Sequence, residues 1–144
     1  MRILLLHRLN LGDLVCASPA LQWLREQFPH ARFRLLTNDF AARVGRLLPE
    51  VEEVLAYRKF GDQAPREWRQ WLRARAWHPQ RVLTLAFSED RRLEFRARWL
   101  GPCVNTKTNA MLVHVAERIA WTVGWRGEAP LPRVHLRMPT TRGL

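Results

Sequence analysis

Strand-length apolar runs alternate with helical patterns along this chain, and that alternation limits its fold more than any other feature. The first run, RILLLHR, is continuously apolar from Ile3 to Leu6, and His7 ends it. Such a run is typical of a strand that is buried on both faces of a parallel sheet. We therefore expect it to be the central strand of a sheet.

A helical pattern follows this first run. Residues 13–28 repeat apolar side chains at the spacing of one buried helix face, and Pro29 ends the pattern. Pro19 lies inside it, where it either kinks the helix or begins the main body of the helix with Ser18 as its N-cap. The sequence alone leaves both arrangements open.

The cycle of strand and helix then repeats along the chain. The later strands and helices are predicted at RFRLLT, NDFAARVGRLL, EEVLAY, PREWRQWLRARAW, RVLTLAF, SEDRRLEFRARWLG and TNAMLVHVAERIAWTVG. Asn38 and Ser88 are the expected N-caps of the second and fourth helices. The order predicts an α/β fold with a Rossmann-like, doubly wound parallel sheet. The proline-broken segment APLPRVHLRMP after the last helix is expected to be extended.

The chain is strongly basic, with a formal net charge of +11 at pH 7. A surface of this charge attracts phosphate-bearing partners such as nucleic acid, anionic lipid or sugar phosphates. All but two of the 24 basic residues are arginine. The planar guanidinium suits bidentate contacts with phosphate, although biased coding composition produces the same excess.

The two cysteines and the short first apolar run bound the environment of the protein. Cys16 and Cys103 have neither CxxC spacing nor histidines at metal-ligand intervals, so we expect reduced, buried thiols and no metal site. The first apolar run is too short for a signal peptide or a membrane span. We therefore expect a cytoplasmic protein, with at most peripheral contact with the inner face of the inner membrane.

The junction RLNLGD places Gly12 and Asp13 directly after the predicted central strand. In open α/β sheets, ligands bind at the carboxyl ends of the strands, near a switch in strand order. The chain contains neither GxGxxG nor GxxxxGK[ST], the common dinucleotide and phosphate loops. As a helix N-cap, Asp13 would accept free backbone N–H groups; as a general base, it would take the proton of an acceptor hydroxyl.

The basic segment YRKFGDQAPREWRQWLRAR is a second candidate site. Arg66, Arg69 and Arg73 share one face of the predicted helix, and Arg58 and Lys59 lie on the preceding loop. These side chains either grip phosphates or form the solvated face of an amphipathic helix.

His114 and Arg118 fall on the side of the last predicted helix that is opposite its apolar face. A histidine of this kind needs a serine or cysteine nucleophile beside it to suggest catalysis, and no such context is present. We therefore interpret His114 as a surface residue.

Residues 1–57 resemble the opening of the bacterial ADP-heptose:lipopolysaccharide heptosyltransferases, glycosyltransferase family nine. The shared pattern is an apolar strand, a Gly-Asp pair, Pro-Ala-Leu in the next helix, Phe-Pro at its end, and PEVEEV before the third strand. Further on, HVAERIAWTVGW is similar to the His-x-x-Glu-Arg helix of that family. The likeness extends to about residue 136 and is looser over residues 58–107.

The resemblance implies a GT-B enzyme of two Rossmann-like domains that is metal-independent and inverting, of which this chain is the N-terminal, acceptor-side half. It implies that Asp13 is the general base and that Gly12 permits close approach of the acceptor. The acceptor would be a phosphorylated glycolipid of the Kdo-lipid A type, and ADP-heptose the donor substrate, with no cofactor. The acceptor-binding residues predicted on this basis are Gly12, Arg58, Lys59, Arg66 and Arg69.

Residues 1–136 correspond to the first domain of that family, and residues 137–144 to a tail or to the start of the interdomain linker. Because no donor-binding C-terminal domain follows, we expect a truncated chain that is inactive alone, or one that works with a separate donor domain. The competing interpretation is a non-catalytic basic α/β module that binds nucleic acid or another polyanion through the helix from Arg66 to Arg73.

Overall fold

The computed structural model describes residues 1–8, 10–58, 65–86, 91–105, 111–112 and 114–137, and the side chains of residues 65–67 lie outside the description. Within these residues, parallel strands form one sheet in the order β3-β2-β1-β4. The strands are β1 (Arg2–Leu6), β2 (Arg32–Asn38), β3 (Val51–Tyr57) and β4 (Arg81–Thr84). The helices are α1 (Leu11–Gln27), α2 (Asp39–Gly45), α3 (Pro65–Ala76), α4 (Arg91–Leu100) and α5 (Val115–Thr122).

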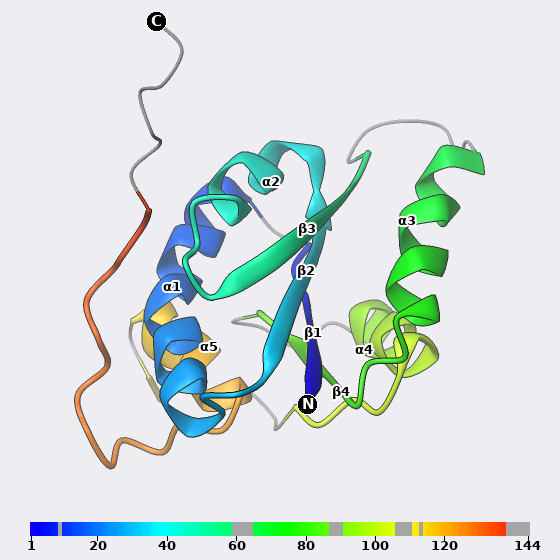
Figure 1. Ribbon diagram of the computed structural model, residues 1–144. Helices are drawn as coiled ribbons and strands as arrows, with labels where there is room; N and C mark the ends of the chain where they lie inside the picture. Colours follow the sequence, from blue (N-terminus) through cyan, green and yellow to red (C-terminus); the bar gives the residue numbers. More distant parts are fainter. Residues whose placement is uncertain (9, 59–64, 87–90, 106–110, 113, 138–144) are drawn as a thin grey trace, which may run out of the picture.

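The α/β fold and the central place of β1 are confirmed. Ile3 lies opposite Phe33 of β2 on one side and opposite Arg81 of β4 on the other. Helices α1, α2 and α5 cover one face of the sheet, and α3 and α4 cover the other (Figure 1). The sheet is therefore the middle of three layers.

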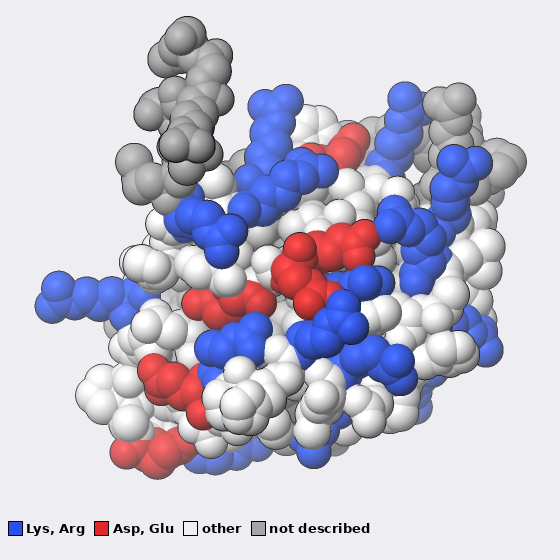
Figure 2. Space-filling view, viewed as in Figure 1, with Lys and Arg blue, Asp and Glu red and all other residues white. Residues whose placement is uncertain are grey.

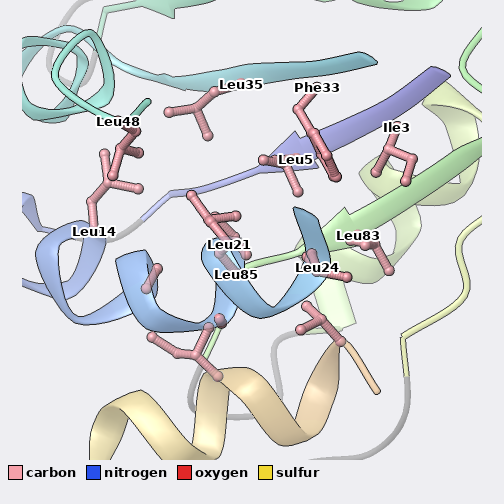
Figure 3. Packing of buried hydrophobic residues seen from close by; sticks show 14 of the residues in the cluster. Ile3, Leu5, Leu14, Leu21, Leu24, Phe33, Leu35, Leu48, Leu83 and Leu85 are labelled. Atoms are coloured by element: carbon pink, nitrogen blue, oxygen red, sulfur yellow. The ribbon is translucent and has the colours of Figure 1, made fainter. Parts of the chain in front are cut away.

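Alternation along β1 divides the core between these two faces. Ile3 and Leu5 pack with α1 and α5, whereas Leu4 and Leu6 pack with α3 and α4, because successive strand residues point to opposite faces. All four side chains are fully buried. Figure 3 shows the first cluster, with leucines of α1 lying between the strands and α5. An apolar run without alternation was thus a correct indication of a strand buried on both faces.

Helix α1 begins earlier than predicted. It starts at Leu11 with Asn10 as the N-cap, so Gly12 lies in the first turn and not in the loop. Asp13 is consequently the third residue of the helix, and the alternative that made it the N-cap is wrong. The helix also runs without interruption through Pro19, which excludes a separate start at Ser18.

The other helix starts agree with the prediction in part. The side chain of Asn38 accepts a hydrogen bond from the backbone N–H of Ala41 at 2.9 Å, which confirms it as the cap of α2. Ser88 lies outside the described residues. The last helix is shorter than predicted, and His114 is the N-cap of α5 instead of a residue on its face.

The segment after α5 is extended, as its prolines predicted, and it runs along α1 (Figure 1). The backbone N–H of His135 donates to Ser18 Oγ at 3.0 Å, and Leu136 packs on the core. Cys16 and Cys103 are free thiols, as predicted. They are half-buried, so the prediction that they are buried is wrong. No helix among the described residues is long and apolar enough to span a membrane.

Candidate functional site

The carboxyl ends of the strands meet at one edge of the sheet, and polar residues gather there. The chain leads from β1 to β2 on one side and places β4 on the other, so the strand order reverses between β1 and β4. Open α/β sheets bind ligands outside the carboxyl edge at such a switch point. The described residues of this edge with polar or charged side chains include His7, Arg8, Asn10, Asp13, Thr37, Asn38, Asp39, Tyr57, Arg58 and Thr84.

Asp13 lies at this edge in the first turn of α1 and is half-buried. Its Oδ2 accepts a hydrogen bond from the backbone N–H of Asn10 at 3.1 Å, the return bond of a capping box. Among the residues that the structure describes, no hydrogen bond reaches Oδ1. One oxygen therefore orients the carboxylate, and the other can accept a proton from a ligand.

A buried polar cluster, which the sequence interpretation missed, holds His7, the first residue after β1 on the way to α1. His7 is fully buried, and its Nδ1 lies 2.9 Å from Thr37 Oγ1. The Tyr57 hydroxyl donates to the carbonyl oxygen of His7 at 3.4 Å, a long hydrogen bond. These contacts join the ends of β1, β2 and β3. The available signal was the position of all three polar residues at or just beyond the ends of buried strands.

Gly12 stands beside Asp13 with open space around it. Apart from its chain neighbours and the backbone of its own helix, no atom of the described residues lies within 4 Å of the place that a Cβ would occupy. The packing of this chain therefore does not require glycine here. A glycine that the fold does not need is consistent with close approach of a ligand to the backbone.

The structure places the predicted basic residues in different surroundings. Arg58 directly follows β3 and is exposed, and Arg69 is exposed on α3. Arg66 lies in the first turn of α3, where its side chain is not described, and Lys59 lies outside the described residues. Arg73, on the same predicted face, donates to Glu53 Oε1 at 2.7 Å, so it is engaged within the protein.

Arg73 belongs to an ion network over the amino halves of β2 and β3, away from the edge. Arg32 Nη2 and Arg34 Nε lie 3.0 and 3.3 Å from Glu52 Oε1, and Arg34 Nε lies 3.0 Å from Glu53 Oε2. Partial burial alone would raise the pKa of the Glu52 carboxyl. The hydrogen bonds and charges of Arg32 and Arg34 outweigh burial and hold that pKa below its usual value.

The arrangement at the edge suits proton transfer and anion binding. An oriented carboxylate stands beside open backbone, with a basic side chain at the end of β3. Within the described part of the chain, no group of three or more His, Cys, Asp and Glu side chains could hold a metal ion.

Solved structures of heptosyltransferases share this fold. The E. coli heptosyltransferase WaaC with ADP matches with a TM-score of 0.70 and 18% identity, over 92% of this chain and 49% of that chain. The glycosyl transferase family 9 protein from Veillonella parvula matches with a TM-score of 0.65 and 18% identity, over 85% and 40%. The E. coli ADP-heptose LPS heptosyltransferase II matches with a TM-score of 0.65 and 15% identity, over 97% and 47%.

The chain spans about half the length of these solved structures. No protein-family model and no curated protein sequence matches it. The structural match to family-nine heptosyltransferases agrees with the resemblance in the sequence. At such low identity it establishes the fold, which is that of the N-terminal half of the GT-B heptosyltransferases.

Proposed function

We propose that this chain is the acceptor-binding domain of a heptosyltransferase-type glycosyltransferase that acts in lipopolysaccharide core synthesis. The observation that carries the proposal is the Asp13 carboxylate, which lies at the switch point with one oxygen held by Asn10. The fold match to heptosyltransferases supports the same assignment.

In the proposed reaction, a hydroxyl of the acceptor sugar attacks the anomeric carbon of the ADP-sugar. The new bond from oxygen to carbon forms as the bond from carbon to the ADP oxygen breaks, so the configuration inverts and ADP leaves. Asp13 takes the hydroxyl proton as the new bond forms. A positioned base of this kind typically contributes about 100- to 10,000-fold to the rate.

The residues around Asp13 have supporting roles in this proposal. The buried contacts of His7 with Thr37 and Tyr57 fix the loop that leads to α1. Gly12 leaves room for the acceptor sugar, and Arg58 attracts the phosphates of the glycolipid. Lys59, Arg66 and Arg69 are further acceptor contacts proposed from the sequence. For Arg66 and Arg69 the proposal is supported by the position of α3, which begins at the end of the molecule where β3 ends (Figure 1).

The test is a sugar-transfer assay with ADP-heptose and a deacylated Kdo-lipid A acceptor. Purified chain is measured with and without a separately expressed donor domain from a homologous enzyme. We expect turnover with the added domain and a loss of at least about 100-fold in Asp13→Asn. Asp39→Asn is the matched control, because Asp39 is exposed in the first turn of α2.

Two results would contradict the proposal. The first is no turnover from a folded chain with the donor domain present. The second is turnover that survives Asp13→Asn, which would remove the base from the mechanism. Binding of nucleic acid that persists in Asp13→Asn, without transfer, would favour the polyanion-binding module instead.

A further inference from the structure

Large apolar side chains are exposed on the two helices that cover one face of the sheet. Trp68 and Leu72 lie one turn apart on α3, with 57% and 55% of their surfaces exposed. Phe95 and Trp99 lie one turn apart on α4, and Phe95 is 76% exposed. The rings of Trp68 and Trp99 meet edge to face, with centroids 6.2 Å apart. These four residues form one surface across both helices, here named the α3–α4 patch.

Arginines lie beside the α3–α4 patch. The guanidinium of Arg75 lies 4.5 Å from the ring centroid of Trp99, and that of Arg96 lies 5.6 Å from Trp71 beneath the patch. The sequences of α3 and α4 together contain eight arginines and two glutamates. Figure 2 shows basic side chains over the side of the molecule where Figure 1 places these helices.

The charge of these helices limits what can cover the patch. A second copy of the same surface would bring its own arginines against these arginines, and like charges disfavour that contact. A partner must therefore be negatively charged and must also accept Phe95 and Leu72 in an apolar environment. The headgroups of an anionic bilayer supply the charge, and its acyl chains supply the apolar layer below.

We propose that the α3–α4 patch binds the surface of an anionic membrane. Phe95 and Leu72 enter the boundary between headgroups and acyl chains, and the tryptophan rings and arginines remain at headgroup level. The biological reason for membrane binding rests on the proposed function, since a glycolipid acceptor would be presented at a membrane. Helix α3 begins at the end of the molecule where β3 ends, so a bound membrane would lie on the α3 side of the carboxyl edge (Figure 1).

The experiment is co-sedimentation of the full chain with vesicles of phosphatidylglycerol and phosphatidylcholine, compared with vesicles of phosphatidylcholine alone. No sugar substrate is present, so this result is independent of any transfer activity. We expect binding to the anionic vesicles that weakens as salt is added. Phe95→Ser should reduce the affinity by roughly tenfold, from the loss of one buried aromatic side chain. Phe40→Ser, which removes another exposed phenylalanine from α2, should not change it.

Charge is tested separately with matched pairs of exposed arginines. Arg91→Gln combined with Arg98→Gln, both on α4, should reduce affinity for anionic vesicles by roughly 20-fold. Arg43→Gln combined with Arg133→Gln removes the same charge elsewhere and should have a much smaller effect. Circular dichroism verifies that each variant is folded.

Three outcomes would overturn the proposal. The first is equal vesicle binding by Phe95→Ser and Phe40→Ser, which would show that the patch is not the contact. The second is self-association of the chain that Phe95→Ser abolishes, because the patch would then bind a second copy. The third is binding of single-stranded nucleic acid that the α4 variants abolish while vesicle binding is absent. Failure of the sugar-transfer assay alone would leave the membrane proposal intact.

Discussion

At the scale of single residues, Asp13 combines a structural role with a proposed chemical one. Its Oδ2 accepts the backbone N–H of Asn10, which stabilises the first turn of α1. The same bond fixes the direction of the carboxylate, so that a proton acceptor would already be oriented before the acceptor sugar arrives. The capping role is thus compatible with the proposed catalytic role and does not compete with it.

Replacement of Gly12 by alanine should separate stability from function. A Cβ at Gly12 meets no atom within 4 Å in the described part of the chain beyond its own helix turn. Because alanine is favoured over glycine in a helix, stability should rise by up to about 0.5 kcal/mol. Acceptor affinity should fall, because the methyl group occupies the space proposed for the sugar. Thermal unfolding and acceptor titration measure the two effects.

Gly124→Ala is the matched control for Gly12→Ala. Gly124 follows α5 with φ of 122°, which favours glycine, so its alanine variant should lose about 1 kcal/mol of stability. Acceptor affinity should be unchanged in that variant. Unchanged acceptor affinity in Gly12→Ala would contradict the proposed role of Gly12.

The Glu52 carboxyl makes a pH-dependent contribution to stability. Because its pKa is lowered in the folded protein, its stabilising effect is present above the usual pKa of 4.5 and disappears as pH falls through the folded pKa. Glu52→Gln should therefore lose about 0.5 to 1 kcal/mol at neutral pH, the range of partly exposed ion pairs.

Urea unfolding at neutral and acidic pH measures this contribution. The difference between Glu52→Gln and the parent chain should shrink as both are acidified. Glu26→Gln, on an exposed part of α1, serves as the control and should differ little from the parent at either pH. A Glu52→Gln deficit that persists in acid would show that the ion network is not its cause.

At the scale of elements, Asn105 holds the edge strand β4 to α5. Its Oδ1 accepts the backbone N–H of Thr84 at 2.6 Å, and its Nδ2 donates to the carbonyl oxygens of Thr84 and Thr122 at 2.8 and 3.1 Å. One side chain thus replaces the backbone of a further strand at the end of β4. Strand β4 lies on the side of β1 where the strand order reverses.

Asn105→Ala should destabilise the protein by about 2 to 3 kcal/mol. The substitution leaves the Thr84 backbone groups without their partner in a part-buried place. Chemical denaturation measures the loss, and hydrogen exchange should show faster exchange of the β4 amides. Gln27→Ala is the contrasting change and should cost little, because it removes an exposed amide side chain at the end of α1. Equal losses in both variants would contradict the role of Asn105 as a bridge.

Local patterns predicted most of the elements because the signals were local. The continuous run from Ile3 to Leu6 identified the central strand, and Asn38 identified the start of α2. The start of α1 was missed because Leu11 and Gly12 carry no strong helix signal, although Asn10 is a good N-cap residue. Pro19 was ambiguous, since tertiary packing and not propensity decides whether a helix continues through proline.

The candidate site was predictable only where chemistry and position coincide in the sequence. Asp13 lies where the helix after the central strand begins, so its place at the sheet edge could be inferred. The sequence shows that His7, Thr37 and Tyr57 stand at or just beyond the ends of buried strands. Their contacts with one another depend on the pairing of three strands separated in the sequence, which a local pattern does not give. The ion pair of Arg73 with Glu53 was missed for the same reason.

At the scale of the whole molecule, the sheet separates two surfaces with different proposed tasks. The carboxyl edge carries Asp13 and Arg58, and the outer face of α3 and α4 carries the aromatic and arginine-rich patch. The net charge of +11 is consistent with binding of phosphates at the carboxyl edge and of anionic lipid at the α3–α4 patch. The chain matches about half of each heptosyltransferase structure, so transfer is best tested with a donor domain supplied.

The most direct test of the central claim is an NMR titration of the isotope-labelled chain with deacylated Kdo-lipid A. The acceptor-site assignment predicts that the amide signals of Leu11, Gly12, Asp13 and Arg58 shift together, and that Asp13→Asn still binds although it no longer transfers sugar. Binding without shifts at the junction of β1 and α1, or no binding by a folded chain, would contradict the assignment of this edge as the acceptor site.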